Sequence, residues 1–406
     1  MSRILILADD LTGANDTAIQ FVKQGFSSLV IINADSATAA LFDGYNVISV
    51  NSDSRRLDSA GAYQVISKTV KQFGAGFLVY KKVDSALRGN PGQELGAVMD
   101  TLDIPLGLAA PSFPANRSVI ENGKLSNGTD AVAVFANGTG KKTENIPLGV
   151  IRKGADGIAA FINFHEGTHI FVADAVTDND LEVVYKASAS LAKPHVLAGS
   201  AGLADQLARS LGKAETTPPG KPAALSPALI VAGTRQGETA VQIDTFCKMF
   251  PGTLVRFDVS MISSGNAENA ITGAFDEASR LMRQNPGLCV IAVDSMFTET
   301  GFAGQTAAYT EGDETGAAIS EALGVLTEKL MNSFGFPALL TTGGDTTLAV
   351  CRHLGVSAIE PLAEIYPGIP LGKIAGGPYD GCFIVTKSGR FGNPGSLVEI
   401  VDWRMK

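Results

Sequence analysis

Short apolar segments that end abruptly in charged residues recur through the first part of this chain. Residues 4–8, 47–50 and 77–80 are strand-like, and carboxylates or cations follow each of them within a few positions. Burying such ends is costly unless the charges share a solvated crevice. In open parallel α/β sheets, ligands bind in the crevice beyond the carboxyl ends of the strands. The pattern therefore predicts a parallel sheet whose strand ends bind a small, polyhydroxylated anion.

Strand-like and helix-like segments alternate along most of the chain, which is typical of a mostly parallel sheet with helices on both faces. Residues 115–170 break this rhythm, and we expect short strands and loops there, including an apolar piece at 131–135. We expect that insertion to line one side of the crevice. In the rest of the first half, strands are expected over 4–8, 28–32, 47–50, 77–80, 106–110, 169–173 and 195–198, and helices over 15–23 with Asn15 or Asp16 as cap, 58–72, 93–99 and 178–191.

A linker is expected at residues 212–227, which contain four prolines and two glycines without apolar periodicity. It separates a first domain at 1–211 from a second at 228–406. The fold class expected is α/β: two α/β domains with mostly parallel sheets flanked by helices, and an active-site cleft between them. In the second domain, strands are expected over 228–232, 254–257, 288–293, 338–340 and an antiparallel edge strand at 382–386, and helices over 238–249, 267–284, 317–334 and 346–353.

Composition excludes several classes of protein. The net charge of −9 and pI near 5.1 argue against a nucleic-acid-binding protein, which would show a basic face. The first apolar run is too short for a signal peptide, and no apolar stretch approaches the roughly 18 residues that span a bilayer. Four scattered cysteines without a C-x-x-C spacing are expected to be buried free thiols. We expect a cytoplasmic protein with no nucleic-acid or membrane partner, and a homodimer is compatible with the sequence.

The strongest motif of the second domain is the segment 337–347, in which Gly343 and Gly344 separate a strand from a helix. Free backbone N–H groups and the positive end of a helix meet at such a turn and favour an anion. Asp345 or Thr346 is expected to cap the helix. The alternative is an ordinary tight turn. The segment matches neither a P-loop nor a Rossmann glycine fingerprint.

Two further glycine-rich turns follow strands in the same domain. Residues 233–237 contain Thr234, and residues 387–392 contain Gly389. Three such turns with hydroxyl groups and a few cations resemble a pocket for a nucleotide triphosphate more than unrelated loops do. We therefore expect the second domain to bind a nucleotide.

In the first domain, Asp9 and Asp10 admit three interpretations: a general base for a hydroxyl, ligands of sugar hydroxyls or Mg²⁺, or caps of the next helix. Arg55 and Arg56 are either binding residues or a solvated pair at a helix start. The run Lys81-Lys82-Val83-Asp84 and Arg88 form a further cluster. Two lysines beside one aspartate would repel each other, so we interpret them as cations that hold a substrate carboxylate.

One motif is a decoy. His165-Glu166-Gly167-Thr168-His169 matches the H-E-x-x-H zinc signature, which functions only on a helix. Glycine and threonine inside it, and the strand-like run directly after it, predict a loop between strands instead.

The motifs in their order resemble the four-carbon acid sugar kinase family, and the resemblance covers nearly the whole chain. This resemblance implies a sugar-acid domain followed by an ATP domain. It implies ATP-dependent phosphorylation of the 4-hydroxyl of a four-carbon acid, with D-threonate as the expected substrate and 3-oxotetronate or D-erythronate as alternatives. The stretches that carry it are ADDLTGANDT (8–17), KKVDSALRGN (81–90), APSFPANR (110–117), GSAGLA (199–204), TTGGDTTLAV (341–350) and TKSGRFG (386–392).

The resemblance also implies site residues. The substrate site would involve Asp9, Asp10, Arg55 and the run from Lys81 through Val83 to Asp84, to which we add Arg88. The ATP site would involve Thr234, Gly343 to Thr346 and Gly389. The chain departs from commoner family forms at Ala86, which lacks a hydroxyl, and at Thr234, which keeps one in place of serine.

For the mechanism, we expect Arg55 and Lys82 to hold the carboxylate, and Asp10 and Asp84 to act as the catalytic pair that holds hydroxyls. One of the two aspartates would accept the 4-OH proton. Mg²⁺ would bridge the phosphates of ATP, with ligands that the sequence leaves open. A non-catalytic sugar-acid sensor is the alternative from a different class. An NAD-dependent dehydrogenase is disfavoured by the missing dinucleotide fingerprint.

Overall fold

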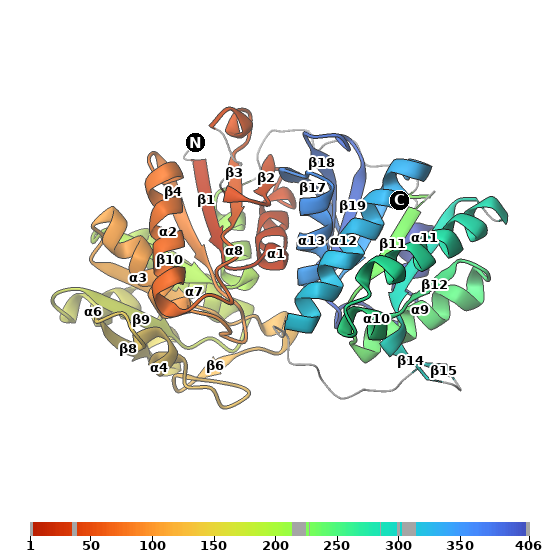
Figure 1. Ribbon diagram of the computed structural model, residues 1–406. Coiled ribbons are helices and arrows are strands. Elements are labelled where there is room, and N and C mark those ends of the chain that lie inside the picture. Colours follow the sequence, from red (N-terminus) through yellow and green to blue (C-terminus); the bar gives the residue numbers. More distant parts are fainter. Residues whose placement is uncertain are drawn as a thin grey trace. The chain divides into compact units, whose positions relative to one another are not determined.

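A computed structural model describes residues 3–34, 39–212, 225–226, 228–284, 286–298, 301–302 and 314–402. The chain divides into two compact units, Met1–Pro218 and Pro219–Lys406, each an α/β structure (Figure 1). The linker expected at 212–227 lies almost entirely outside the described residues. Among the helices that are described, none is long and apolar enough to cross a bilayer.

Strands and helices alternate along most of the first unit. Its strands are β1 Arg3–Ala8, β2 Ser28–Ile31, β3 Val47–Asn51, β4 Phe77–Lys82, β5 Leu106–Ala110, β6 Ile120–Glu121, β7 Lys124–Leu125, β8 Lys142–Ile146, β9 His169–Ala173 and β10 His195–Gly199. Its helices are α1 Leu11–Val22, α2 Ser59–Phe73, α3 Pro91–Leu102, α4 Ala131–Ala136, α5 Leu148–Ile151, α6 Ala155–Phe164, α7 Asp178–Ser190 and α8 Ala201–Ser210, with short 3₁₀ turns η2 Ala39–Phe42 and η3 Pro114–Asn116.

The sheet of the first unit has the order β2-β3-β1-β4-β10-β5-β9-β8, and its described pairs are all parallel. The chain leaves β1 toward β2 and β3 on one side and then crosses to β4 on the other side. The direction of winding therefore reverses at β1, which makes its carboxyl end the topological switch point where ligands bind in such sheets.

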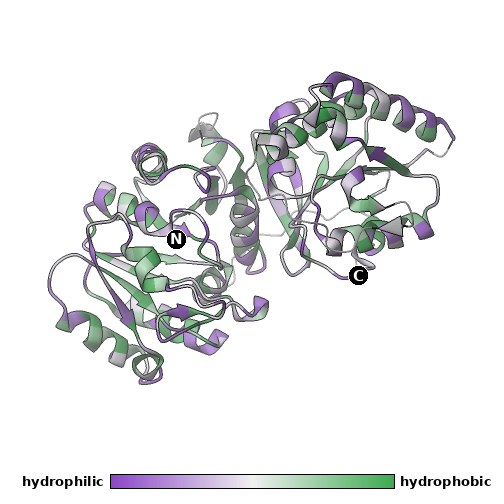
Figure 2. Cartoon of the chain, turned by 60° about the horizontal axis from the view of Figure 1, so that its bottom comes forward, coloured by the Kyte–Doolittle hydropathy of each residue, from purple (hydrophilic) through white to green (hydrophobic). Residues whose placement is uncertain are grey.

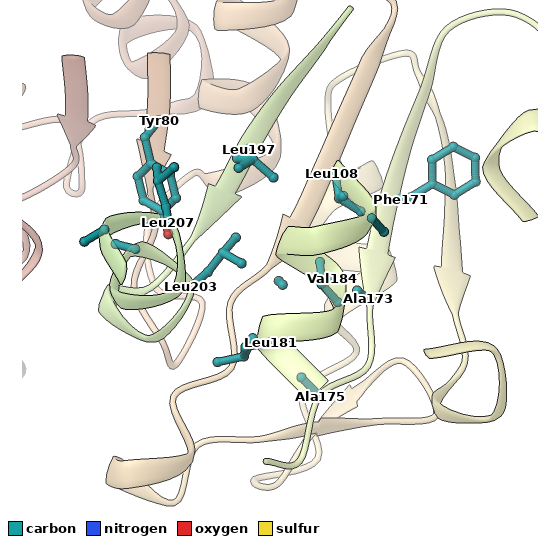
Figure 3. Packing of buried hydrophobic residues seen from close by; sticks show 14 of the residues in the cluster. Tyr80, Leu108, Phe171, Ala173, Ala175, Leu181, Val184, Leu197, Leu203 and Leu207 are labelled. Atoms are coloured by element: carbon teal, nitrogen blue, oxygen red, sulfur yellow. The ribbon is translucent and has the colours of Figure 1, made fainter. Parts of the chain in front are cut away.

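Helices cover both faces of this sheet, as the expected fold class requires. Helix α1 packs on α8, α8 on α7 and α7 on α6, whereas α2 packs on α3 and α3 on α4. In the core, apolar side chains of α7 and α8 meet side chains of β4, β5, β9 and β10 (Figure 3). The hydroxyl of Tyr80 in this core donates to the carbonyl of Ser200 at 2.7 Å, so no polar atom of that ring is buried without a partner. Apolar residues concentrate on the strands, and polar residues on loops and outer helix faces (Figure 2).

The region 115–170 differs in part from the expectation of short strands and loops. The apolar piece at 131–135 lies in helix α4, which begins where the Asp130 side chain accepts a hydrogen bond from the N–H of Ala133. Helices α5 and α6 and strand β8 also lie in this region, and β8 extends the parallel sheet. The expected short strands are confirmed by β6 and β7, but the helices were missed because they are short, and the Asn and Gly residues between them obscure a helical period.

The second unit follows the expected alternation closely. Its strands are β11 Ala228–Ala232, β12 Leu254–Phe257, β13 Leu288–Val293, β14 Phe297–Thr298, β15 Gly301–Phe302, β16 Ala338–Thr342, β17 Ala358–Tyr366, β18 Ile369–Ala375 and β19 Phe383–Lys387. Its helices are α9 Gly237–Met249, α10 Val259–Ser263, α11 Ala267–Gln284, α12 Glu314–Phe334, α13 Gly344–His353 and α14 Ser396–Val401, with the 3₁₀ turn η4 Asp294–Met296.

The sheet of the second unit has the order β12-β13-β11-β16-β19-β18-β17. The strand expected as an antiparallel edge is β19, and that placement is wrong. Strand β19 pairs in parallel with β16 and in antiparallel with β18, so it lies inside the sheet. The antiparallel hairpin of β17 and β18, which the sequence analysis missed, covers the position where the edge was expected.

Candidate functional site

Three neighbouring strands of the first unit bring charged residues to one edge of the sheet. Strand β1 lies between β3 and β4, and all three are parallel, so their carboxyl ends meet. Asp9 and Asp10 follow β1, Arg55 lies four residues after β3 ends, Lys82 ends β4, and Asp84 follows it. The switch point of the topology therefore coincides with the charged cluster predicted from the sequence.

The Arg55 guanidinium lies at the centre of this cluster. It binds Asp9 in a bidentate pair, from Nε to Oδ2 at 2.7 Å and from Nη2 to Oδ1 at 3.0 Å. Its Nη1 donates to Asp10 Oδ2 at 2.6 Å, and its Nη2 lies 3.8 Å from Asp84 Oδ1. Arg55 therefore joins the carboxylates that follow two different strands, rather than forming a solvated pair with the exposed Arg56.

Asp10 caps helix α1, because its Oδ1 accepts a hydrogen bond from the N–H of Gly13 at 2.8 Å. The expected cap at Asn15 or Asp16 is therefore wrong, since the helix begins four residues earlier. The pKa of Asp10 is raised by burial and by the neighbouring charge of Asp9, and the cations Arg55 and Lys82 oppose this only in part. The pKa of Asp9 is lowered, because Arg55 and the two lysines outweigh its burial.

Asp84 is held by Arg88 in a second bidentate pair, at 2.8 Å from Nε and 3.1 Å from Nη2. Burial alone would raise the pKa of Asp84, but the hydrogen bonds from Arg88 and the charge of Arg55 outweigh it and hold the pKa far below its usual range. Asp84 is therefore a firmly ionised group, whereas Asp10 is the more basic carboxylate of the two.

Lys81 and Lys82 do not share one environment, although they are adjacent in sequence. Both lie within β4, where successive side chains point to opposite faces of the sheet. The fully buried Lys81 ammonium binds Glu94 Oε2 of α3 at 2.7 Å and donates to the carbonyls of Leu7 and Lys82. Their mutual repulsion, on which the sequence argument relied, is therefore avoided by geometry, and Lys81 has no ammonium proton left for a ligand.

Lys82 lies on the other face, toward α1, with only 4% of its surface exposed. A Cβ added to Gly13 would lie 2.7 Å from Lys82 Nζ, which places the ammonium against the first turn of α1. Within the part of the chain that is described, the ammonium makes no hydrogen bond and no ion pair. Its charge is partly balanced by the nearby carboxylates of Asp9, Asp10 and Asp84. A buried ammonium whose protons bind no acceptor is nevertheless costly, and this one faces the positive end of a helix dipole. An anion bound at this point would relieve both costs.

Val83 and Glu94 both support the structure around the cluster, although the sequence suggested only Val83 as a site residue. The Val83 side chain is buried, and its backbone N–H donates to the carbonyl of Gly199 at 2.9 Å. Glu94, which the sequence analysis missed, accepts hydrogen bonds from Ser54 Oγ and Lys81 Nζ. A carboxylate at the start of the otherwise apolar stretch 94–99 was the available signal. Its pKa is raised by burial, which the charge of Lys81 only partly offsets.

In the second unit, the three glycine-rich turns meet at the carboxyl ends of the adjacent parallel strands β11, β16 and β19. A Cβ added to Gly389 would lie 2.4 Å from Thr234 Oγ1, and one added to Gly343 would lie 3.5 Å from the Thr234 backbone nitrogen. The turns are thus in contact around Thr234. The sequence-predicted nucleotide residues of three separate segments lie together within this unit.

Helix α13 begins without a side-chain cap. Its N-cap is Gly343, whose φ of 102° is in the left-handed region, and no side-chain hydrogen bond satisfies its first turn. The expected cap at Asp345 or Thr346 is therefore wrong. Asp345 lies exposed in the first turn, and Thr346 is buried against Gly233. The arrangement leaves the first backbone N–H groups of the helix directed at the cluster of turns, which favours a phosphate group.

Lys387 stabilises the cluster of glycine-rich turns. Its buried ammonium donates to Thr239 Oγ1 at 3.2 Å and to the carbonyls of Ser388 and Phe391, each at 3.0 Å. Burial lowers its pKa to about 8, against a smaller opposing effect of Glu238. Lys387 therefore fixes the last glycine turn and is not a free cation for a ligand.

The described residues contain no group of three or more His, Cys, Asp or Glu side chains able to hold a metal ion. In the H-E-x-x-H decoy, His165 ends helix α6 and His169 starts strand β9, with non-helical residues between them. The rejection of a zinc helix is confirmed, although the loop joins a helix to a strand rather than two strands. The four cysteines are free thiols, as expected, but only Cys289 and Cys351 are buried, whereas Cys247 and Cys382 are partly exposed.

Family models match both units of the chain. One, described as a sugar-binding N-terminal domain, matches residues 4–133 and 126–207. The other, described as a nucleotide-binding C-terminal domain, matches residues 229–397. The charged cluster thus lies within the first match, and the glycine turns lie within the second.

Curated relatives extend over nearly the whole chain. The D-threonate kinase of Salmonella typhimurium is 28% identical over 98% of this chain and 97% of its own length. The D-erythronate kinase of Heliobacterium modesticaldum is 26% identical over 99% and 97%, and the 3-oxo-tetronate kinase of Pseudomonas savastanoi is 28% identical over 95% and 94%. A crystal structure from Salmonella typhimurium LT2 has the same fold, with a TM-score of 0.78 at 20% identity over 98% of both chains.

Proposed function

Since this chain belongs to the four-carbon acid sugar kinase family, whose members are ATP-using phosphotransferases, we propose that it phosphorylates the 4-hydroxyl of D-threonate. D-Erythronate and 3-oxotetronate are the alternative substrates, because relatives of similar identity are named for them. The observation that carries the proposal is the buried ammonium of Lys82 at the switch point of the sugar-binding unit, which acts on Asp9, Asp10 and Asp84 by its charge but makes no hydrogen bond among the described residues. The reaction consumes ATP, and we place it in the cytoplasm, where ATP is made available.

The substrate carboxylate is proposed to bind Lys82 and the first turn of α1. Arg55 was expected to share this task, but three of its five N–H groups already bind Asp9 and Asp10. We therefore assign Arg55 to holding those carboxylates in place, where Asp9, Asp10 and Asp84 can accept hydrogen bonds from sugar hydroxyls. The Arg88 side chain, which is 54% exposed, is positioned to close over a bound acid.

The phosphates of ATP are proposed to bind the turns of the second unit. Thr234 and Gly389 supply a hydroxyl and a close backbone approach, and the run from Gly343 through Gly344 and Asp345 to Thr346 supplies the N–H groups of α13. Mg²⁺ usually binds through one or two carboxylates together with substrate phosphates. Asp345 is the exposed carboxylate that would hold it, and the ion would neutralise charge on the phosphates.

Phosphoryl transfer depends mainly on positioning and charge stabilisation, so the acceptor hydroxyl needs only a modest base. We propose Asp10 as the group that accepts the 4-OH proton, because its raised pKa makes it the stronger base. Asp84, whose pKa is held low by its arginine partners, would orient a hydroxyl without taking its proton. Transfer further requires the phosphate bound by one unit to reach the hydroxyl held by the other.

An ADP-release assay tests the function directly. We expect ADP release from ATP with D-threonate, and little with L-threonate, D-erythronate or 3-oxotetronate, and phosphorus NMR should place the new phosphate on C4. If another of these acids is preferred, the proposed substrate is wrong but the assignment as a four-carbon acid sugar kinase remains. Binding of the acid by calorimetry without ADP release would indicate a sensor, and it would exclude the kinase proposal.

Gly13 provides a test of the carboxylate site. A Gly13→Ala substitution would place a methyl group 2.6 Å from Asp10 Oδ1 and 2.7 Å from Lys82 Nζ. We expect KM for the acid to rise about 10-fold, because misplacement of a binding group by a fraction of an ångström is costly. KM for ATP should stay unchanged. Gly273→Ala in α11 is the matched control, because no atom beyond its chain neighbours and its own helix backbone lies within 4 Å of the added Cβ. Equal KM values for both variants and wild type would refute the placement of Lys82.

A further inference from the structure

Glu94 of helix α3 is a buried neighbour of the charged cluster. It connects the ends of the three strands after which the charged residues lie. Its side chain is only 1% exposed. Its Oε1 accepts a hydrogen bond from Ser54 Oγ at 2.5 Å, and Ser54 directly precedes Arg55. Its Oε2 binds Lys81 Nζ at 2.7 Å. Both carboxylate oxygens are therefore committed to neighbours of site residues.

Lys81 extends these connections to the other two strands. Its ammonium donates to the carbonyl of Leu7, two residues before Asp9, at 3.1 Å. It also donates to the carbonyl of Lys82 at 2.6 Å, next to the peptide that leads to Asp84. Each acceptor lies within two residues of a group in the cluster.

Ser54 adds a connection back to the first strand. Its Oγ lies 2.7 Å from Ser52 Oγ, which donates to the carbonyl of Ala8 at 2.8 Å. The ends of β3, β1 and β4 are thus joined by one buried polar network, and Glu94 is the member that comes from outside them, on α3.

Stability alone does not explain this network. A buried ion pair rarely stabilises a fold more than apolar residues of similar volume would. A network in which every member is satisfied does, however, hold its groups in one geometry. Catalytic constellations depend on such support, since small displacements of positioned groups are costly.

We propose that Glu94 is a positioning residue for the phosphotransferase reaction, acting through Lys81 and Ser54 to hold the Asp9–Asp10, Arg55 and Lys82–Asp84 segments in register for the sugar acid. The proposal rests on the proposed function, since it assigns Glu94 to the substrate side of that reaction. It predicts that loss of Glu94 affects the acid and leaves the nucleotide unaffected.

The test compares three variants with wild type. Ser54→Ala removes one arm of the network, and we expect kcat/KM for the acid to fall about 10-fold with KM for ATP unchanged. Ser28→Ala, which removes a buried serine hydroxyl at the amino end of β2, is the control and should have wild-type kinetics. The double variant Lys81→Met/Glu94→Leu replaces the ion pair by apolar side chains. We expect it to keep a Tm near that of wild type while kcat/KM for the acid falls about 100-fold.

The outcomes separate this inference from the proposed function. If wild type releases ADP and the folded double variant has wild-type kcat/KM, the positioning role is overturned and the kinase remains. A lower kcat with unchanged KM values for both the acid and ATP would indicate that a smaller fraction of the protein is active. That result would also overturn the positioning role. If wild type releases no ADP with any acid, the kinase proposal fails, and calorimetric binding of D-threonate to the same variants then tests whether Glu94 organises the acid site.

Discussion

Lys82→Met is expected to lower kcat/KM for the sugar acid by more than about 10²-fold while the Tm of the protein changes little. Loss of a buried charged partner costs a bound carboxylate about 3 kcal/mol. The fold loses no hydrogen bond of the Lys82 ammonium among the described residues and no longer buries that charge, but it loses the attraction of the ammonium to Asp9, Asp10 and Asp84. Steady-state kinetics with each substrate varied in turn, together with thermal unfolding, measure both effects.

Lys71→Met is the control for this prediction, because Lys71 is an exposed lysine on α2 and should be replaceable without effect. A Lys82→Met protein that has lost both stability and ATP binding would show that Lys82 supports the fold. Unchanged affinity for the acid would show that the carboxylate binds elsewhere, and the assignment of the site would then be wrong.

Asp10→Asn is expected to lower kcat by about 10²- to 10⁴-fold, the range typical of a lost general base. Asparagine is as good an N-cap as aspartate, so helix α1 and the hydrogen bond to Gly13 should persist, although the hydrogen bond from Arg55 Nη1 to Asp10 Oδ2 is lost with the second carboxylate oxygen. In wild type, the base must be ionised, so activity is present above the pKa of Asp10 and is lost as the pH falls through it. Because that pKa is raised, the acid limb of the kcat/KM profile should lie above the usual range of an aspartate.

Asp58→Asn is a control for the change of the capping carboxylate to an amide. Asp58 caps α2 through the N–H of Gly61 at 2.8 Å, as Asp10 caps α1 through Gly13, but it is exposed and outside the cluster. We expect wild-type kinetics from it. Retention of kcat in Asp10→Asn, or an acid limb that persists unshifted in that variant, would exclude Asp10 as the proton acceptor. The Asp84→Asn variant would then be the next to examine.

Much of the fold follows from local sequence patterns. The expected strand at 228–232 and helix at 267–284 are confirmed with the same bounds as β11 and α11. Such segments combine a clear apolar period with Gly or Pro at their ends. The hairpin of β17 and β18 was missed, because its long antiparallel strands carry Pro and Gly and depend on pairing with β19.

Helix starts were less predictable than helix interiors. Asp10 caps α1, and Gly343 precedes α13, whereas the sequence favoured Asn15 or Asp16 and Asp345 or Thr346. Several residues near a helix start have side chains that can cap the helix. Which of them becomes the N-cap depends on the residue at which the preceding strand ends. That point is set by strand pairing, which a single segment does not reveal.

The sequence by itself determined that the apolar strands are followed by charged residues in one part of the chain and by glycine-rich turns in the other. Both features are patterns of consecutive residues and can therefore be recognised without the fold. The sequence thereby identified a two-part α/β chain with an acidic and basic cluster in one part and glycine turns in the other. Only the tertiary structure decided that Lys81 and Lys82 face opposite sides of β4, that Arg55 is held by Asp9 and Asp10, and that Glu94 of α3 completes the network. The physical reason is that the partner of a charged side chain is chosen by strand order and by the helix packed on each face of the sheet, and these contacts join residues far apart in the chain.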